Sequence, residues 1–211
     1  NYAALWAEIS KQGQIVEAYA YAIDRGDSKQ QQFQQILRNL GFTVKLKPYI
    51  QRSDGSAKGD WDVGITIDIM DAADHVDEVV LASGDPLFYG IGTRLIAHFG
   101  IERVRIIPGI SAVQYLCAKA GIDMNDIWLT SSHGRDVCFD ELARQRKVAM
   151  VTDGRCGPRE IAAQLAARGK GYRWMVIGEN LAMDNERIHW LPVSEVDGEY
   201  EMNAVVILDE R

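Results

Sequence analysis

The sequence predicts an α/β protein of two domains, and three observations support this class. Helical and strand-like segments alternate along its 211 residues, which is typical of a parallel sheet with helices on both faces. The chain is 47% hydrophobic, enough for two modest cores, since domains usually hold roughly 100–200 residues. Three strand-like segments near the C-terminus could form hairpins, which predicts a mixed second sheet. We therefore expect a Rossmann-like, mostly parallel first sheet in residues 1–130 and a smaller mixed-sheet α/β domain in residues 137–211.

The N-terminal elements follow from periodicity and capping residues. Tyr2–Ile9 suits a short helix, and Ile15–Ile23 alternates as a strand does. Ser28 is a favoured N-cap for a helix through Leu40, and Gly41 ends that helix because glycine tolerates left-handed conformations. Two segments follow, a β-rich run at residues 42–50 and a polar, glycine-containing loop at residues 51–60.

The middle of the chain continues the alternation. Trp61–Ala73 carries apolar residues in a mostly helical register, and Glu78–Ser83 is a short apolar run typical of a buried strand. Pro86–Phe99 predicts a helix, because its apolar residues form one helical stripe and proline is favoured in a first turn. The remaining predicted elements are strands at Val104–Ile107, Val148–Thr152, Trp174–Ile177, Ile188–Pro192 and Asn203–Leu208, and helices at Ser111–Ala120 and Pro158–Arg168.

Composition argues against several classes of protein. The net charge of −7 is not that of a basic nucleic-acid binder, although a local basic patch could still bind a polyanion. The three cysteines show no CxxC spacing, so neither a zinc site nor a disulfide framework is expected. No apolar stretch approaches the roughly 18 residues that span a bilayer. We expect a cytoplasmic protein without membrane association and leave a homo-oligomer open.

Two strand-to-helix junctions carry the candidate small-molecule site. Gly84 would let a ligand approach the backbone at the carboxyl end of a strand, and Asp85 could cap the helix expected at Pro86. Pro108 and Gly109 repeat this geometry, with Ser111 as the cap of a second helix. A plain strand-to-helix turn is the competing interpretation of the first junction.

Five motifs in the C-terminal part occur in a characteristic order. They are VVLASGDPLFYGIGTRLIAHFG, VRIIPGISAVQYLCAKAGI, LTSSHGR, MVIGENLAMDNERI and MNAVVIL. From about residue 79 to 211 the chain resembles cobalt-precorrin-7 (C-5) methyltransferases, of the tetrapyrrole methylase family. The resemblance implies methyl transfer from S-adenosylmethionine to a corrinoid precursor in cobalamin biosynthesis.

The resemblance also implies site residues, without assigning a catalytic group. The implied cofactor-binding residues are Gly84, Asp85, Leu87, Ser111, Ala112, Asn180, Leu181 and Ala204, and the implied substrate-binding residues are Ser132, His133 and Arg135. Arg135, Arg155 and Arg159 are candidates for holding the acidic side arms of a corrinoid. For each of the three, a solvated surface arginine is the alternative interpretation. A missing catalytic triad does not count against methyl transfer, which needs positioning more than an acid–base pair.

The first part of the chain carries the sequence pattern of a different family. The segment AYAYAIDRGDSKQQQFQQILRNLGFTVKLKPYIQRSDGSAKGDWDVGITIDIMDAAD, continuing into VVLASGD, resembles the NYN family of PIN-like metal-dependent ribonucleases. The resemblance implies an Mg²⁺ or Mn²⁺ site for RNA cleavage, with Asp62 and Asp85 as ligands. For the acids between Asp60 and Asp74, a solvated acidic helix face is the alternative interpretation.

Each resemblance is incomplete at a functional point. The glycine-rich G-x-G-P-G loop that opens the methyltransferases has no counterpart in residues 1–78, and Leu87 stands where the nucleases have another acid. The switch between the resemblances falls between about Asp77 and Asp85, which suggests a natural or engineered hybrid, a chimera. We expect a methyltransferase with weak or no turnover, with a ribonuclease or a catalytically silent hybrid as alternatives. Without a central strand, Ile15–Ile23 should pair directly with Val79–Ser83 in a four-stranded first sheet.

Overall fold

The computed structural model describes residues 2–24, 28–48, 50–51, 57–58, 61–133 and 135–211. The chain divides into two compact units. Unit 1 comprises residues 1–52, 57–81 and 91–106, and unit 2 comprises residues 53–56, 82–90 and 107–211. These units reflect packing, so the expected domains, 1–130 and 137–211, stay a prediction. No helix in the described ranges is long and apolar enough to cross a membrane.

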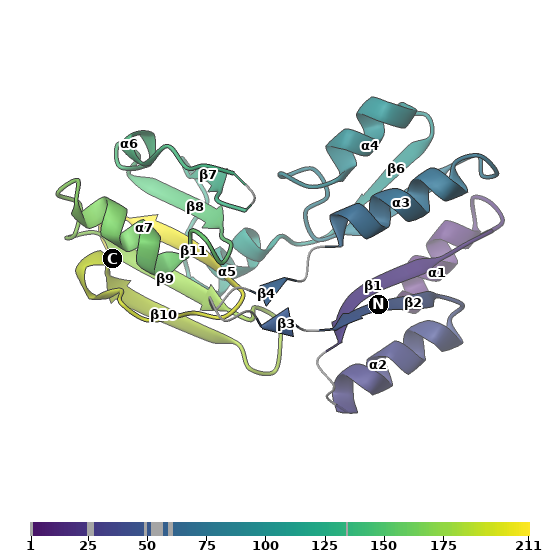
Figure 1. Ribbon diagram of the computed structural model, residues 1–211, viewed down its shortest axis with the longest axis horizontal. Coiled ribbons are helices and arrows are strands. Elements are labelled where there is room, and N and C mark those ends of the chain that lie inside the picture. The colour runs from purple at the N-terminus through teal and green to yellow at the C-terminus, as the bar shows by residue number, and fades with distance from the viewer. Residues whose placement is uncertain (1, 25–27, 49, 52–56, 59–60, 134) are drawn as a thin grey trace. The chain divides into compact units, whose positions relative to one another are not determined.

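In its described residues, unit 1 contains three separate pairs of strands together with helices (Figure 1). Its elements are α1 (Tyr2–Ser10), β1 (Tyr19–Asp24), α2 (Ser28–Asn39), β2 (Thr43–Pro48), β3 (Ile50–Gln51), β4 (Ala57–Lys58), α3 (Asp62–Ala72), β5 (Val79–Ser83), α4 (Gly92–Phe99) and β6 (Val104–Pro108), of which β5 and β6 continue into unit 2. Strands β1 and β2 are parallel, from Tyr19 opposite Thr43 to Asp24 opposite Pro48. Strand β5 pairs with β6, and β3 pairs with β4.

Helix α3 contacts the β1–β2 pair and the β5–β6 pair of unit 1. On one side Ile65 and Ile69 pack against the apolar cluster formed by β5, α4 and β6. On another side Asp68 accepts hydrogen bonds from Tyr21 of β1 and Lys45 of β2, at 2.6 and 2.5 Å. Figure 1 shows α3 between these elements. The two sides of one helix thus join two strand pairs that do not share hydrogen bonds in the described residues.

Unit 2 is built on a five-stranded mixed sheet in the order β10-β9-β11-β8-β7. Its elements are α5 (Ala112–Ala120), β7 (Trp128–Ser131), α6 (Phe139–Leu142), β8 (Lys147–Val151), α7 (Pro158–Ala166), β9 (Trp174–Glu179), β10 (Arg187–Pro192), a 3-10 turn (Val193–Glu195) and β11 (Asn203–Leu208). Strands β7 and β8 are parallel. Strand β11 is antiparallel to both β8 and β9, and β10 is antiparallel to β9.

The two faces of this sheet carry separate cores. On one face Ile161 and Leu165 of α7 pack with Met150, Ile177 and other fully buried side chains. On the other face Val113 and Leu116 of α5 pack with Ala149, Val176 and Val206. The alternation of inward side chains along each strand puts neighbouring residues on opposite faces, so a helix can cover each one. The predicted α/β class with a mixed second sheet is confirmed.

Several predicted element limits are wrong. The strand predicted from Ile15 begins at Tyr19, near the first residue that pairs with β2. The loop predicted at residues 51–60 contains part of the β3–β4 pair. The expected direct pairing of β1 with β5 is also wrong, because the structure pairs β1 with β2 and β5 with β6 in separate sheets. Side-chain contacts from α3, which periodicity does not reveal, join the two pairs instead.

The helix predicted from Pro86 begins only at Gly92. Residues 84–91 form a turn, in which the Phe88 N–H donates to Asp85 Oδ1 at 3.3 Å. Tyr89 has a left-handed φ of +54°, which interrupts a right-handed helix. Gly90 allows the tight turn, since a Cβ there would lie 2.6 Å from the Pro86 carbonyl oxygen. Asp85 therefore caps this turn and not the helix.

Candidate functional site

The strand register brings several predicted site residues to one edge of the unit 2 sheet. Ser131, at the end of β7, lies opposite Val151 at the end of β8. Ala204, at the start of β11, lies opposite both Val151 and Gly178. Residues that follow β7, β8 and β9 therefore share this edge with the beginning of β11. All eleven residues implied for the cofactor and the substrate belong to unit 2.

The segment after β7 holds the predicted substrate residues. Ser132 is buried, its N–H donates to the Val151 carbonyl at 3.0 Å, and its hydroxyl donates to the Cys156 carbonyl at 2.8 Å. His133 is exposed, and its N–H donates to Ser131 Oγ at 3.0 Å. Burial raises the pKa of the Cys156 thiol, which keeps it protonated near neutral pH. Ser132 thus fixes the loop, whereas His133 presents its ring to solvent.

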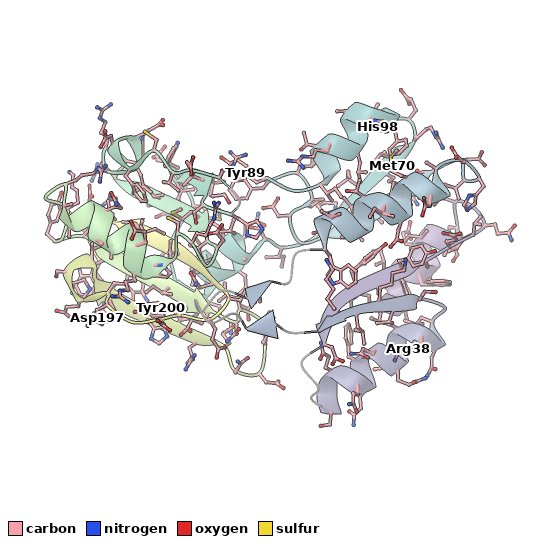
Figure 2. All side chains as sticks on the ribbon, in the orientation of Figure 1. Arg38, Met70, Tyr89, His98, Asp197 and Tyr200 are labelled. Atoms are coloured by element: carbon pink, nitrogen blue, oxygen red, sulfur yellow. The ribbon has the colours of Figure 1, made fainter. Side chains whose placement is uncertain are left out.

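The three candidate arginines have different surroundings. The Arg135 guanidinium lies 4.0 Å from the centre of the Tyr89 ring, a cation–π distance. Tyr89 is 46% exposed and comes from the turn after β5, as labelled in Figure 2. Arg155 pairs with Asp153 at 3.6 Å, and Arg159 is exposed in the first turn of α7. Among these three arginines, Arg135 is the one that links the segments after β5 and β7.

The junctions after β5 and β6 lie against each other. The Gly109 N–H donates to the Ser83 carbonyl at 2.8 Å. A Cβ at Gly84 would lie 3.0 Å from the Ile110 carbonyl oxygen, so the chain's own backbone already favours glycine there. This contact explains Gly84 without a ligand. Leu87, which follows in the turn, has 52% of its surface exposed.

Ser111 and Gln114 form a capping box at the start of α5. The Gln114 N–H donates to Ser111 Oγ at 3.1 Å, and the Ser111 N–H donates to Gln114 Oε1 at 3.0 Å. The predicted helix and its cap are confirmed. Ala112 is exposed in the first turn of this helix, where backbone N–H groups have no partner within a helix.

The turn after β9 carries Asn180 and Leu181. Asn180 is buried, has a left-handed φ of +49°, and its N–H donates to the Met202 carbonyl at 2.8 Å. Leu181 packs over Gly178, where a Cβ would lie 2.7 Å from its side chain. Leu181 and Ala204 belong to the same apolar cluster as α5. Three of the predicted cofactor residues thus lie at one corner of the sheet.

Sequence analysis missed the buried carboxylate of Glu179, at the end of β9. Its side chain is only 3% exposed. Oε1 lies 2.7 Å from His189 Nε2, and Oε2 lies 3.2 Å from Arg187 Nη2. Oε2 also accepts the Glu201 N–H at 2.8 Å. A glutamate inside the apolar run MVIGE was the available signal, because buried carboxylates require partners.

The predicted metal ligands gain no support. Asp62 belongs to unit 1 and Asp85 to unit 2, and the Asp62 side chain lies outside the described part of the structure. Within that part, no group of three His, Cys, Asp or Glu residues could hold a metal ion. The alternative interpretation, a solvated acidic helix face, agrees with exposed Asp71 of α3 and with exposed Asp74, which follows that helix. It is wrong for Asp68, whose side chain is 17% exposed and paired with Lys45.

Comparison with known proteins matches the two halves to two families. Residues 1–107 match the NYN domain family. Over 150 residues, 71% of this chain, the sequence is 77% identical to cobalt-precorrin-7 C(5)-methyltransferase of Salmonella typhimurium, and the match covers 75% of that protein. The chain belongs to the cobalt-precorrin-7 C(5)-methyltransferase family and carries an NYN domain. The hybrid resemblance drawn from the motifs is therefore confirmed.

More distant relatives agree with the methyltransferase family. A precorrin-6Y C(5,15)-methyltransferase of Sinorhizobium is 33% identical over 112 residues, 52% of this chain and 27% of that protein. The crystal structure of a precorrin-6Y methylase from Archaeoglobus fulgidus covers 96% of this chain and 88% of its own, with a TM-score of 0.58 and 19% identity. That likeness shows a shared fold, which extends over both units.

The two family matches overlap. Together, the matches of 107 and 150 residues are 46 residues longer than the 211-residue chain. The two matches therefore share at least about that many residues. A match of 150 residues must begin at or before about residue 62 of 211. The C(5)-methyltransferase likeness therefore extends further toward the N-terminus than Val79. The shared stretch contains β5 and the Ser83-Gly84-Asp85 junction, where the motifs place the switch between families.

Proposed function

We propose that the chain binds S-adenosylmethionine and a corrinoid in unit 2 and transfers a methyl group between them with low turnover. The observation that carries this proposal is the 77% identity over 150 residues to a cobalt-precorrin-7 C(5)-methyltransferase. The register of the unit 2 sheet supports it, because the segments after β7 and β9 and the start of β11, which carry Ser132, Asn180 and Ala204, share one sheet edge. The Archaeoglobus structure supports the fold of such an enzyme.

The residues at this edge fit an adenosylmethionine site. The first turn of α5 offers backbone N–H groups beside exposed Ala112, and such groups favour anionic ligand groups such as a carboxylate. Leu181 and Ala204 supply apolar surface from the cluster on the α5 face. The left-handed turn at Asn180 presents backbone polar groups next to that surface. Apolar walls with a few fixed polar groups are typical of cofactor sites.

The chain contributes positioning more than acid–base chemistry. When bound, adenosylmethionine supplies a methyl group on a sulfonium for direct in-line transfer, which depends on orientation. Arg135, steadied against the Tyr89 ring, would hold an acidic side arm of the corrinoid. Arg155 is less suited because Asp153 already pairs with it. Exposed His133 stands in the same segment as a further polar contact for the substrate.

We expect low turnover because part of the Salmonella methyltransferase lies outside the match. The C(5)-methyltransferase match covers 75% of the Salmonella protein, and the chain has no G-x-G-P-G sequence. In the proposed site, the loop that would pack on the cofactor from the first strand is missing. We therefore expect adenosylmethionine to bind with a Kd above about 1 μM, weaker than about −8 kcal/mol.

Calorimetry with adenosylmethionine and absorbance titration with a cobalt corrinoid bearing free carboxylates test the proposal. We expect weak cofactor binding and corrinoid binding that Arg135→Ala weakens about tenfold, as loss of a charged hydrogen bond would. Arg144→Ala, which removes an exposed arginine after α6, is the matched control and should leave both affinities unchanged. If either ligand fails to bind, the proposal is refuted and a silent hybrid is favoured.

The NYN match over residues 1–107 makes a ribonuclease the second candidate. We propose that this activity is lost, because Leu87 replaces an acid of the resembling nucleases and Asp85 Oδ1 is already engaged by the Phe88 N–H. Incubation of single-stranded RNA with the chain and Mn²⁺ should give no cleavage. Mn²⁺-dependent cleavage that Asp85→Ala abolishes would overturn this view.

A further inference from the structure

Glu179 stands at the corner of the sheet where three of the proposed cofactor residues meet. It is the last residue of β9, opposite Arg187 on β10 and Asn203 on β11. The Glu179 carboxylate contacts the side chains of Arg187 and His189 and the backbone N–H of Glu201. One buried carboxylate at the end of β9 therefore contacts β10 on one side and the segment before β11 on the other.

The backbone that follows Glu179 is under conformational strain. Asn180 and Ala182 both have left-handed φ values, +49° and +62°. Asparagine tolerates this region, whereas for alanine it costs about 1–2 kcal/mol. Such conformations persist only where surrounding contacts fix them.

Two sets of contacts hold the turn. On one side the Asn180 N–H donates to the Met202 carbonyl at 2.8 Å, and the Asn180 side-chain amide donates to the Glu201 carboxylate. On the other side the Ala182 N–H donates to Glu186 Oε2 at 2.7 Å, and Glu186 pairs with Lys119 of α5 at 3.1 Å. The first set depends on the position of residues 201–202, and Glu179 fixes that position through the Glu201 N–H.

We propose that Glu179 is a positioning residue for the cofactor: by anchoring the segment before β11, it holds Asn180 and Leu181 in the conformation that binds adenosylmethionine. This inference rests on the proposed function. The Glu179 carboxylate is 3% exposed and acts through Glu201 and Asn180. Its charge is balanced at the sheet margin by Arg187, whose side chain is 56% exposed, and its Oε1 lies 2.7 Å from His189 Nε2.

The same sheet offers a matched control at its opposite end. Arg173 precedes β9, is fully buried, and its Nε lies 2.9 Å from Oδ1 of Asp209, which follows β11. Trp174 and Leu208, the neighbours of this pair, lie opposite each other in the register. Asp209→Asn removes a carboxylate from a buried ion pair on the same two strands, far along them from Asn180. It should destabilise the sheet without disturbing the turn.

The test compares Glu179→Gln, Glu179→Ala and Asp209→Asn in the full chain, measuring adenosylmethionine affinity by calorimetry and amide exchange of residues 180–186 and 199–203 without ligand. We expect Glu179→Ala to weaken binding at least about tenfold and to speed exchange in both segments about tenfold. Glu179→Gln, which keeps one oxygen for the Glu201 N–H, should show an intermediate effect. Asp209→Asn should lower the melting temperature and leave both segments and the affinity unchanged.

The outcomes separate the inference from the function on which it rests. The positioning role would be overturned if the parent chain and both Glu179 variants bound adenosylmethionine with equal affinity. It would also be overturned if Glu179→Ala and Asp209→Asn had equal effects after allowance for melting temperature. If the parent chain binds no adenosylmethionine, the proposed function fails, and the cofactor role of Glu179 fails with it. The exchange data would then show whether Glu179 still orders the turn.

Discussion

At the scale of single residues, polar side chains join α3 to the β1–β2 pair of unit 1, where apolar packing joins helix and sheet in most proteins. Tyr21 and Lys45 project from β1 and β2 onto Asp68 of α3. The Tyr21 ring also lies 5.2 Å from the ring of Trp61, whose indole N–H donates to the Ala22 carbonyl at 3.0 Å. Burial and the Asp68 carboxylate raise the pKa of Tyr21, so its hydroxyl stays a donor. Asp68 is therefore the main polar link between α3 and the first strand pair.

Replacing Asp68 with asparagine should destabilise unit 1 by about 1–3 kcal/mol near neutral pH. Burial opposes ionisation of Asp68, but hydrogen bonds from Lys45 and Tyr21 outweigh it and lower its pKa. A lowered pKa gives stability that is present above the unfolded value, about 3.9, and is lost as the pH falls through the folded value. Urea unfolding of parent and variant should therefore differ most above about pH 5 and converge as the pH falls below the unfolded value and through the lowered folded value.

The control for this prediction is Asp71→Asn, which alters an exposed carboxylate on the same helix. Its effect should stay within about 0.5 kcal/mol, as for most surface substitutions. A similar loss of stability in both variants would mean that the helix charge, and not the contacts of Asp68, is responsible.

At the scale of elements, α5 connects the predicted cofactor segment to the core of unit 2. Its first turn is fixed by the capping box of Ser111 and Gln114. Its apolar face, with Val113 and Leu116, packs on the sheet beside Ala204. Gly178 makes that packing possible, since a Cβ there would lie 2.7 Å from Leu116. The helix start is therefore placed by the sheet as well as by its cap.

Ser111→Ala should lower the free energy of unfolding by about 0.5–2 kcal/mol, because the Gln114 N–H loses its acceptor. Thermal or urea unfolding would measure the change. Gln114→Glu should be close to neutral, because glutamate can still accept the Ser111 N–H. A loss with Gln114→Glu as large as with Ser111→Ala would show that the capping box is not the cause.

At the scale of the whole molecule, the two units differ in how their cores are closed. In unit 2 helices cover both faces of a five-stranded sheet, and Val148, Met150 and Val205 have no exposed surface. In unit 1 the strands form two-stranded pairs, and α3 leaves Val63 and Ile67 more than half exposed, with Met70 at 45%. Two-stranded pairs are marginal without further packing. Unit 2 should therefore be the more stable part.

Native-state hydrogen exchange should show this difference. Amides of β8, β9 and β11 should exchange about tenfold or more slowly than those of β1 and β2, since exchange follows local opening. A uniform exchange rate across all these strands would mean that the units unfold together. Exchange of β8 and β11 as fast as in an unfolded chain would contradict the fold of unit 2.

The sequence by itself determined the α/β class, the mixed second sheet, the cap at Ser111 and the two family resemblances. These depend on local periodicity, capping residues and ordered motifs, which a linear sequence contains. It also identified residues that the sheet register brings to one edge, such as Ser132 and Ala204. Their roles in binding stay a prediction.

Only the tertiary structure decided the start of α4, the pairing of β1 and the burial of Glu179 and Asp68. The helix expected at Pro86 gives way to a turn because Tyr89 is left-handed and Gly90 lies against the Pro86 carbonyl. Strand β1 pairs with β2, and α3 joins this pair to β5 and β6 through polar contacts on one side and apolar contacts on another. Asp68 finds its partners on β1 and β2, and Glu179 finds its partners on β10 and in the segment before β11, so the local sequence around each carboxylate does not identify the groups that it contacts.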